Sequence, residues 1–413
     1  MKIGEFAAKF GVNVSTVRYY INNSLLVPGK ENEQYVFDGA CEEDMKNILK
    51  YKEYHFSLEE IQLFFFLKKA SRFKDSVVLD LCSNLMEKKK KELLEERNSL
   101  DVYIDSLEKE IAELPNSIPE GKMRGGIPFS FIPYLYCPKC KVPLKLDSAS
   151  MDSGLLQSGE LWCDCGFKAE IKEGMILCSG YSEDTPFKAF ENVESVASMA
   201  SNYSPAYRRL IDRANLYMYN RLSGRSEDPK IIMTGPFTLN FILAYINKLD
   251  KKNLYIVFDP SKKRLEKLRD YLLEDGYNMV YIAANAEEIP VKEKSVDAYI
   301  DDYCTANSMF TYNTFNIEKL ASLLKPTAIA TGVFNSYVSA PKSLENFKKI
   351  QPDFKPKNMS LSRLKYSWEQ AGFGYMEKKS IGSTSDNSPD YPQDVSGEHT
   401  DVIAYCVRRK GSL

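Results

Sequence analysis

Residues 2–20, KIGEFAAKFGVNVSTVRYY, constrain the fold more than any other stretch of the chain. Apolar residues in its first half recur at the spacing i, i+3, i+4 and i+7: Ile3, Phe6, Ala7 and Phe10. This spacing predicts a short amphipathic helix. Gly11 then supplies a tight turn, because glycine adopts a left-handed backbone conformation at little steric cost. A second helix follows, so the stretch predicts a helix-turn-helix.

The second helix of this motif has an apolar inner face and a polar outer face. Asn13 stands at its N-terminal cap. Val14, Val17 and Ile21 are spaced so that they face inward. Four residues remain on outward or flanking positions, where they can reach base edges and phosphates: Ser15, Thr16, Arg18 and Tyr19. This arrangement predicts a unit that reads double-stranded DNA.

The chain resembles the MerR family of bacterial transcription regulators in three stretches: KIGEFAAKFGVNVSTVRYYINNSLLVP, QYVFD and FSLEEIQLF. The resemblance implies a winged helix-turn-helix, a second wing helix and a dimerising coiled coil. It also implies that the four outward residues contact DNA, together with Lys30 and Tyr35 at the first wing. Where the family usually has Gly-Tyr-Arg, this chain has Gln34, Tyr35 and Val36, so one expected phosphate-binding arginine is absent.

Positive charge is sparse around this unit. The basic residues are Lys2, Lys9, Arg18 and Lys30, whereas residues 31–44 carry several acids. Such thin charge predicts modest non-specific affinity and a shallow salt dependence. The net charge of the chain is -2, so any binding to nucleic acid must come from a local patch. The alternative is a three-helix packing module that no longer binds DNA.

Composition narrows the class of protein. A length of 413 residues predicts about two to four domains, and 44% hydrophobic with 27% charged residues is ordinary for globular chains. No stretch approaches about 18 consecutive apolar residues, and the N-terminus lacks a basic region followed by an apolar one. We therefore expect a cytoplasmic protein with no membrane partner. In such a compartment nine cysteines, four of them in two close pairs, favour metal over disulfides.

A heptad pattern follows the helix-turn-helix. Ser57 and Glu60 have the spacing of a capping box, which predicts the start of a helix over 58–67. Apolar residues then recur every seven positions, with two more at the alternate core position: Met86, Leu93, Leu100, Leu107 and Leu114, then Ile104 and Ile111. Lys90 and Arg97 take the other alternate positions and weaken the first half of the seam. The pattern predicts a coiled coil that makes a homodimer; the alternative is an amphipathic helix folded onto its own chain.

Two pairs of cysteines predict a metal site. Cys137 and Cys140 form a C-x2-C pair, and Cys163 and Cys165 form a C-x-C pair. Thiolates at this kind of spacing can close a tetrahedral site, so we predict structural zinc. C-x-C is a tight knuckle, which leaves Cys178 as an alternative ligand in place of Cys163 or Cys165. The surrounding pattern resembles the small zinc ribbon that precedes the catalytic domain of some ribosomal RNA guanine methyltransferases.

From about residue 200, strands and helices alternate, which predicts a parallel α/β sheet. One strand ends at Gly235, and the next ends at Asp259, where Rossmann-like sites bind ribose hydroxyls. In their order these segments resemble the class I S-adenosylmethionine-dependent methyltransferases over most of residues 200–410. The resemblance implies a cofactor site at Gly235, Asp259, Asn285 and Ala286.

The departures from that family are informative. Met233 stands where family members have an acid, and Gly235 is all that remains of the glycine run before Pro236 and Phe237. Asn285 stands where an Asp usually bonds adenine. A loop this poor in glycine crowds the approach of the cofactor. Three uses of the fold stay open: a pocket repurposed as a sensor, which the sequence favours; a structural or dimerising fold; or S-adenosylmethionine binding with or without turnover.

We predict a multidomain α plus α/β protein that acts as a MerR-type transcription regulator. It would bind promoter DNA as a dimer and affect RNA polymerase indirectly, with a methyltransferase-like domain that has lost catalysis and senses an unknown small-molecule effector. The alternative is an active S-adenosylmethionine-dependent methyltransferase with an autoregulatory DNA-binding domain. The predicted parts are a winged helix-turn-helix at 1–73, a coiled-coil helix at 74–114, a linker at 115–133, a zinc ribbon at 134–180 and a methyltransferase-like domain at 200–413.

Overall fold

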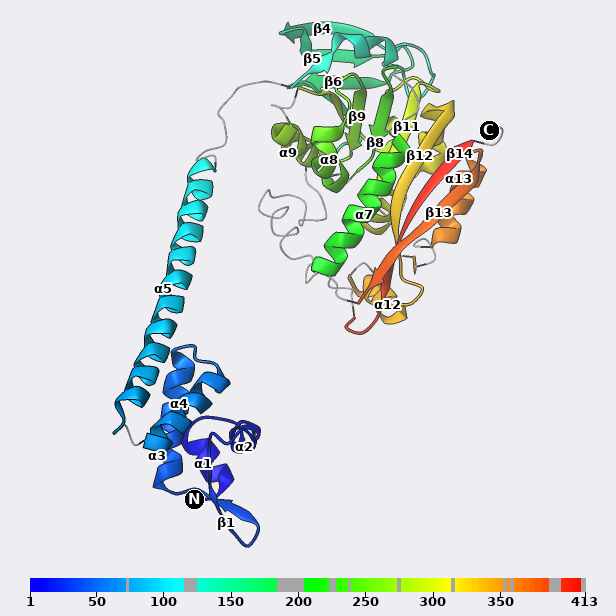
Figure 1. Cartoon of the computed structure of the whole chain (residues 1–413). Coiled ribbons are helices and arrows are strands. Elements are labelled where there is room, and N and C mark those ends of the chain that lie inside the picture. Colours follow the sequence, from blue (N-terminus) through cyan, green and yellow to red (C-terminus); the bar gives the residue numbers. More distant parts are fainter. Residues whose placement is uncertain are drawn as a thin grey trace. The chain divides into compact units, whose positions relative to one another are not determined.

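The computed structural model consists of two compact units, Met1–Glu120 and Gly121–Leu413 (Figure 1). It describes residues 1–71, 74–114, 125–183, 204–222, 228–236, 239–272, 276–312, 316–350, 352, 355–356, 360–385 and 395–409. Within these residues, no helix combines the length and the apolar character needed to cross a membrane.

The N-terminal unit begins with the predicted helix-turn-helix. Gly11, at the turn, has φ 64°, the left-handed conformation that its position predicted. A β-hairpin follows, and its turn residues Asn32 and Glu33 have φ 47° and 65°, as in tight turns that match the twist of the strands. Two more helices complete the lobe. The elements are α1 (Ile3–Lys9), α2 (Val14–Asn22), β1 (Gly29–Glu31), β2 (Gln34–Val36), α3 (Gly39–Glu53) and α4 (Leu58–Ser71).

One hydrophobic core holds this lobe together. Phe6 and Val17 are fully buried in it and join α1 to α2. From α4, Phe64 and Phe65 also enter the core, whereas Phe66 is 69% exposed. The sequence predicted this phenylalanine run to be core or a contact with a partner subunit; two of the three side chains are core.

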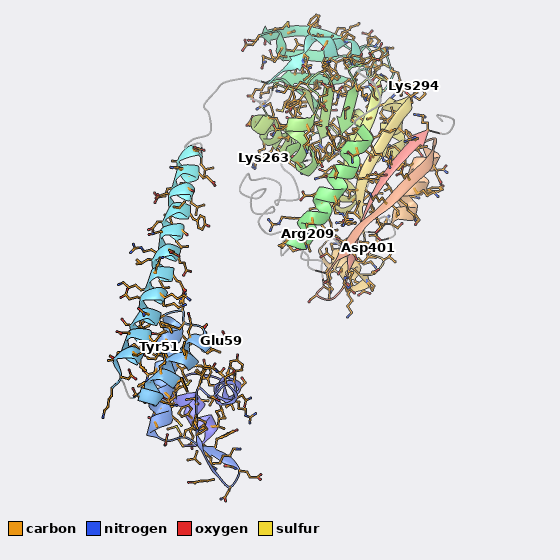
Figure 2. The ribbon with its side chains drawn as sticks, in the orientation of Figure 1. Tyr51, Glu59, Arg209, Lys263, Lys294 and Asp401 are labelled. Carbon is orange, nitrogen blue, oxygen red and sulfur yellow. The ribbon has the colours of Figure 1, made fainter. Side chains whose placement is uncertain are left out.

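A single long helix, α5 (Ser76–Glu113), follows the lobe (Figure 1). Asp75 caps it by accepting a hydrogen bond from the Val77 N–H at 2.8 Å. Its 38 residues correspond to a length of about 57 Å. Cys82, near its start, packs into the core of the lobe, but every residue from 94 to 114 is exposed. The second half of α5 therefore projects away from its own unit, with side chains on all sides (Figure 2).

Seven strands of the C-terminal unit form the sheet that the sequence predicted: β8 (Ile231–Thr234), β9 (Leu254–Asp259), β10 (Asn278–Ala283), β11 (Val296–Asp302), β12 (Leu324–Ser336), β13 (Phe373–Thr384) and β14 (Thr400–Arg409). Their order is β13-β14-β12-β11-β8-β9-β10. Strands β8 to β12 run parallel, and β14 is antiparallel to β12 and β13. The Rossmann-like fold is thus confirmed. The strand order reverses between β8 and β11, the point where such sheets bind ligands.

The cysteine-containing segment continues this sheet instead of forming a separate body. Strand β7 pairs in parallel with β10, and the remaining strands add to β7 in antiparallel fashion. The result is one twelve-stranded sheet. The added strands are β3 (Ile127–Pro128), β4 (Lys145–Asp152), β5 (Leu155–Trp162), β6 (Lys168–Lys172) and β7 (Met175–Cys178).

Helices cover both faces of the α/β part of the sheet, and each face has its own core. One face carries α7 (Pro205–Leu222), α8 (Leu239–Tyr245) and α9 (Lys262–Leu272) (Figure 1). The other is packed by η1 (Phe129–Tyr134), α10 (Cys304–Tyr312), α11 (Ile317–Leu323), α12 (Pro341–Ile350) and α13 (Leu361–Gln370). Trp368, on α13, is 1% exposed and stacks edge-on against Phe373.

Candidate functional site

The predicted DNA-reading residues lie on the outer face of α2. Ser15, Arg18 and Tyr19 are exposed, and Thr16 is partly buried. The opposite face holds the helix in the lobe, since Val17 and Tyr20 are buried. Four neighbouring polar side chains on a rigid helix can donate and accept hydrogen bonds at base edges and phosphates.

Asn13 occupies the N-cap position of α2 as predicted, with extended backbone, but its side chain makes no capping hydrogen bond. The first N–H groups of this helix therefore have no side-chain acceptor at the cap. Backbone N–H groups at a helix N-terminus are common contacts for DNA phosphates. The beginning of α2 is thus available to a phosphate as well as to bases.

The hairpin β1–β2 presents the two predicted wing residues together. Lys30 and Tyr35 are directly opposite in the register, and the Lys30 Nζ lies 5.2 Å from the centre of the Tyr35 ring. This cation–π contact holds an exposed ammonium group at the wing. One nearby cation is already neutralised, because the Lys9 Nζ lies 2.6 Å from a Glu42 carboxylate oxygen. The positive footprint is therefore as thin as the sequence predicted.

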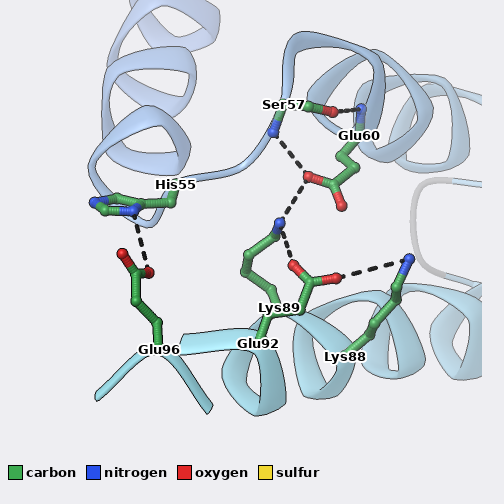
Figure 3. A network of polar contacts seen from close by, with 7 residues as sticks. All are labelled: His55, Ser57, Glu60, Lys88, Lys89, Glu92 and Glu96. Carbon is green, nitrogen blue, oxygen red and sulfur yellow. Dashed lines mark hydrogen bonds and ion pairs between the residues drawn. The ribbon is translucent and has the colours of Figure 1, made fainter. Parts of the chain in front are cut away.

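A polar network joins α5 to the start of α4 (Figure 3). The predicted capping box is present: the Ser57 N–H donates to the Glu60 carboxylate at 2.7 Å, and the Glu60 N–H donates to the Ser57 hydroxyl at 3.1 Å. From α5, the Lys89 Nζ lies 3.1 Å from Glu60 and 2.6 Å from Glu92. Partial burial opposes ionisation of Glu60, but the Ser57 N–H and the Lys89 ammonium outweigh it and lower the pKa of the carboxyl. The network fixes the direction in which α5 leaves the lobe.

The four predicted thiols of the C-terminal unit converge. The sulfur atoms of Cys137, Cys140, Cys163 and Cys165 all lie within 4.8 Å of one another. Those of Cys137 and Cys165 are 3.4 Å apart, and those of Cys140 and Cys163 are 3.2 Å apart. Zinc–sulfur bonds of about 2.3 Å in a tetrahedron require sulfur separations of about 3.8 Å, so the donor set fits one zinc ion with no open position.

Ionisation of the buried ligand is already favoured. Although burial opposes it, the N–H groups of Cys140 and Lys139 lower the pKa of the Cys137 thiol to about 7. A lowered thiol pKa suits a metal ligand, because the thiolate is the form that binds. Cys178, the alternative ligand, lies outside this cluster on β7, where burial raises the pKa of its thiol.

The first cysteine knuckle is attached to the α/β part by main-chain and side-chain bonds. The Tyr136 N–H donates to the Pro290 carbonyl at 3.1 Å, and the Lys292 N–H donates to the Tyr134 carbonyl at 2.9 Å. From α11, the Lys319 ammonium donates to the Pro138 carbonyl at 3.3 Å. A metal at this site would therefore stabilise the wider sheet as well as the local turn.

Asp259, the predicted ribose-binding acid, lies at the end of β9 but is 3% exposed. Its two carboxylate oxygens accept from Arg264: the Nε–H at 2.9 Å and an Nη–H at 2.5 Å. The Ser261 N–H donates to the same group at 2.7 Å. A bidentate guanidinium takes both oxygens of the carboxylate, which is how arginine binds carboxylates most strongly. Arg264 was not predicted, although a basic residue five positions after the acid was visible in the sequence.

Asn285, the predicted adenine contact, bonds to the chain itself. Its side-chain amide donates to the Gly180 carbonyl at 2.9 Å. The Gly180 N–H donates to Glu288 at 2.8 Å, and the Ser179 hydroxyl donates to the same carboxylate at 3.1 Å. Ala286, the fourth predicted cofactor residue, is buried at the start of the short helix η5 (Ala286–Glu288).

The chain just after β7 runs across the ends of β9 and β10. We name residues 179–183 the strap. The Ser182 N–H donates to the Pro260 carbonyl at 2.7 Å, and the Lys262 N–H donates to the Ser182 carbonyl at 3.1 Å. With the bonds to Asn285 and Glu288, the strap is joined to both strand ends. It therefore covers the carboxyl edge of the sheet at which Rossmann-like folds hold a nucleotide.

Gly235 lies at the end of β8 and is buried. A Cβ there would lie 2.5 Å from the Tyr299 hydroxyl and 3.2 Å from the Phe258 ring, so the chain's own side chains require the glycine. Across the switch point, the Phe241 N–H donates to Asp302 at 2.8 Å. Burial raises the pKa of Asp302 to about 7, against the effect of that N–H and with a further rise from Asp301. Phe237 lies outside the described residues.

Three comparisons with known proteins bear on these sites. Residues 1–65 match the family model described as MerR HTH family regulatory protein. No curated protein matches the chain in sequence.

Several solved methyltransferases are similar to the chain in backbone. Phosphoethanolamine N-methyltransferase 2 of Haemonchus contortus, solved with phosphomonomethylethanolamine and S-adenosylhomocysteine, is 12% identical over 48% of this chain and 52% of that chain, with TM-score 0.35. YcgJ of Bacillus subtilis is 13% identical over 48% and 100%, with TM-score 0.36. A SAM dependent methyltransferase from Aquifex aeolicus is 14% identical over 51% and 97%, with TM-score 0.33. The chain thus spans about half the length of the Haemonchus enzyme.

The family match covers the lobe that contains α2, the hairpin β1–β2 and most of α4. It agrees with the exposed polar face of α2 and with the wing residues Lys30 and Tyr35. The order of the strands in the C-terminal unit was derived independently of any relative. Residues 1–65 are therefore a MerR-type helix-turn-helix, joined in one chain to the Rossmann-like α/β domain that the sequence predicted.

Proposed function

We propose that the protein is a dimeric transcription regulator that binds double-stranded promoter DNA, and that its C-terminal unit senses an effector without transferring methyl groups. One observation carries the proposal: the residues of α2 expected to contact DNA are exposed, whereas the residues expected to hold a cofactor are bonded within the chain. A MerR-type regulator of this kind would work in the cytoplasm.

The exposed half of α5 supports the dimer. Leu100, Ile104, Leu107 and Ile111 are between 52% and 64% exposed and follow the heptad spacing. Contiguous apolar surface of this kind mostly marks an interaction site. A second copy of the same helix offers the complementary seam, and a twofold dimer places two copies of α2 for two half-sites on the duplex.

The state of the crevice supports a sensor in place of an enzyme. Binding S-adenosylmethionine in the usual way would require the ribose hydroxyls to displace Arg264 from the Asp259 carboxylate. It would also require the strap to leave Asn285. Separating a buried ion pair leaves an uncompensated charge and costs about 3–5 kcal/mol, which a cofactor would have to offset.

The regulatory step follows from the energy of DNA deformation. Family resemblance implies that the dimer bends and untwists an overlong promoter spacer, so that RNA polymerase is affected indirectly. Such deformation costs on the order of 1–6 kcal/mol. An effector that binds two states of the protein with different affinity can shift an equilibrium by an amount of this size. Zinc at the four thiols would have a structural role, because a four-thiolate site is closed.

Two measurements on the full-length protein test the proposal. Selection from a random duplex pool followed by footprinting should yield a site with two half-sites, protected by a dimer in analytical ultracentrifugation. Calorimetric titration with S-adenosylmethionine and S-adenosylhomocysteine should show no binding at micromolar concentrations. Micromolar binding that is lost in Asp259→Ala would instead support the alternative, an active methyltransferase with an autoregulatory DNA-binding domain.

A further inference from the structure

A groove of about 620 Å³ lies over the strands that extend the sheet, away from the crevice at β8 and β11. Its volume is within the usual range of about 300–1,000 Å³ for small-molecule sites. Side chains of β4, β5, β6 and β7 line it, and two residues of the strap complete it. The groove is separate from the four thiols, although Trp162 in its lining directly precedes Cys163.

Three carboxylates form a row across the lining. Asp147 is opposite Glu160 in the register of β4 and β5, and Glu160 is opposite Glu170 in that of β5 and β6. Residues directly opposite on neighbouring strands share a face, with strands about 4.8 Å apart. Like charges placed this way destabilise a sheet. Among the described residues, neither Glu160 nor Glu170 has an ion-pair partner.

The row continues into apolar and aromatic surface. Leu177 is opposite Glu170 and is buried at the base of the groove. Trp162 and Tyr181 are half-buried in its lining. The indole N–H of Trp162 donates to Asp147 at 2.6 Å, which holds the ring in place. The Lys145 Nζ lies 4.2 Å from the centre of that ring, so the indole already accepts a cation from the chain.

A metal ion does not fit the three carboxylates. Within the part of the chain that the structure describes, the four cysteines are the one group of potential ligand atoms close enough to share an ion. The carboxylates instead spread along a row beside apolar surface, with Lys168 as the cation in the lining. A row of this shape suits charge that is distributed over an extended organic molecule.

We infer that this groove binds an organic cation with a flat aromatic body, whose positive charge lies over Glu160 and Glu170 and whose rings pack between Trp162, Tyr181 and Leu177. Charge complementarity selects the cation, and the aromatic walls select the flat body. As the effector of transcription, this ligand rests on the proposed function; as a binding event, it does not. The strap would report the event, because Ser179 and Tyr181 line the groove while Gly180 bonds to Asn285.

The test uses the full-length protein and three probes of similar shape at pH 8: 10-methylacridinium as the cation, acridine as its neutral counterpart and anthracene-2-sulfonate as the anion. Calorimetry measures affinity, and tryptophan fluorescence places the ligand, since the chain has two tryptophans and Trp368 is 1% exposed in the core. The cation should bind about tenfold tighter than acridine and quench Trp162, and the sulfonate should not bind.

The decisive variant is the double substitution Glu160→Gln and Glu170→Gln. It should weaken binding of the cation about tenfold, while thermal stability stays equal or rises because two facing like charges are gone. The matched control is Glu59→Gln with Glu345→Gln, two exposed acids outside the groove, which should bind as the parent does. Equal affinity for acridine and the cation, or full affinity in the groove variant, would overturn the inference. DNA is absent from the assay, so failure of the proposed function is recognised separately.

Discussion

The recognition helix α2 and the crevice at the ends of β8, β9 and β10 differ in what their polar side chains contact. On α2, Ser15, Arg18 and Tyr19 are exposed, and the helix is held in place by its opposite face. In the crevice, Asp259 is bonded to Arg264 and Asn285 to the strap. Both regions have the residue types of a binding site. The environment of the residues, and not their identity, distinguishes a surface prepared for a partner from one that the chain itself fills.

The two units also differ in what stabilises them. The N-terminal unit has one hydrophobic core and no cluster of potential metal ligands among its described residues. The C-terminal unit carries the four-thiol site at one end of a continuous sheet. Since structural zinc contributes about 10–16 kcal/mol of apparent binding free energy in small domains, metal removal should separate the units more clearly than any substitution.

The largest effect is therefore expected from loss of the metal. The protein should contain one zinc per chain, and a strong chelator or Cys137→Ser should lower the unfolding temperature of the C-terminal unit. Both tryptophans belong to that unit, so their fluorescence follows it selectively. Helical circular dichroism of α3, α4 and α5 should persist at temperatures where the fluorescence has changed. Cys178→Ser is the control and should retain zinc; less than stoichiometric metal in the parent protein would contradict the prediction.

The next largest effect concerns the filled crevice. Arg264→Ala leaves the buried Asp259 carboxylate without its guanidinium, so the C-terminal unit should lose about 3–5 kcal/mol of stability. The double variant Arg264→Leu with Asp259→Leu should recover much of this loss, because no charge is left buried. Denaturant unfolding followed by tryptophan fluorescence measures both. A loss below about 1 kcal/mol in the single variant would mean that the carboxylate is solvated and able to accept a ligand.

The sequence predicted the helix-turn-helix and the Rossmann-like sheet because both depend on local patterns: apolar spacing, Gly11 at a turn, and strands that alternate with helices. It also predicted the four thiols that converge, because ligand spacing is itself local. The capping box of Ser57 and Glu60 is confirmed for the same reason.

The contents of the crevice were not predictable in this way. The bonds from Gly180 to Asn285 and Glu288 join residues more than 100 positions apart, and no pattern in either segment indicates the pairing. The parallel pairing of β7 with β10, which merges the cysteine segment with the sheet, is equally non-local. The Arg264 pair is the exception, since five residues separate the partners. A basic residue that soon follows a strand-end acid deserves to be considered as its partner.

A smaller effect is expected on the DNA side. Arg18→Ala should weaken binding to the selected duplex by about 1–3 kcal/mol, because one charged contact is lost, and should leave the unfolding of both units unchanged. Lys91→Ala removes an exposed cation from α5 and should have little effect on affinity. Fluorescence anisotropy at several salt concentrations measures both, and the slope against salt should be shallow in the parent. Equal affinity of Arg18→Ala and the parent would remove α2 from the interface.

The smallest effect tests the joint between the lobe and α5. Because the pKa of Glu60 is lowered in the folded lobe, its charge stabilises the lobe at pH values above the ordinary 4.5, and this contribution is lost as pH falls below that value. Glu60→Gln keeps a side chain able to complete the capping box but removes the charge facing Lys89, so it should cost about 0.5–1 kcal/mol at pH 7. Circular dichroism of the N-terminal unit measures the cost, which should shrink toward zero near pH 3. Glu59→Gln, an exposed neighbour, should show neither the cost nor its pH dependence. A cost that persists at low pH would assign the effect to packing and leave the direction of α5 independent of this ion pair.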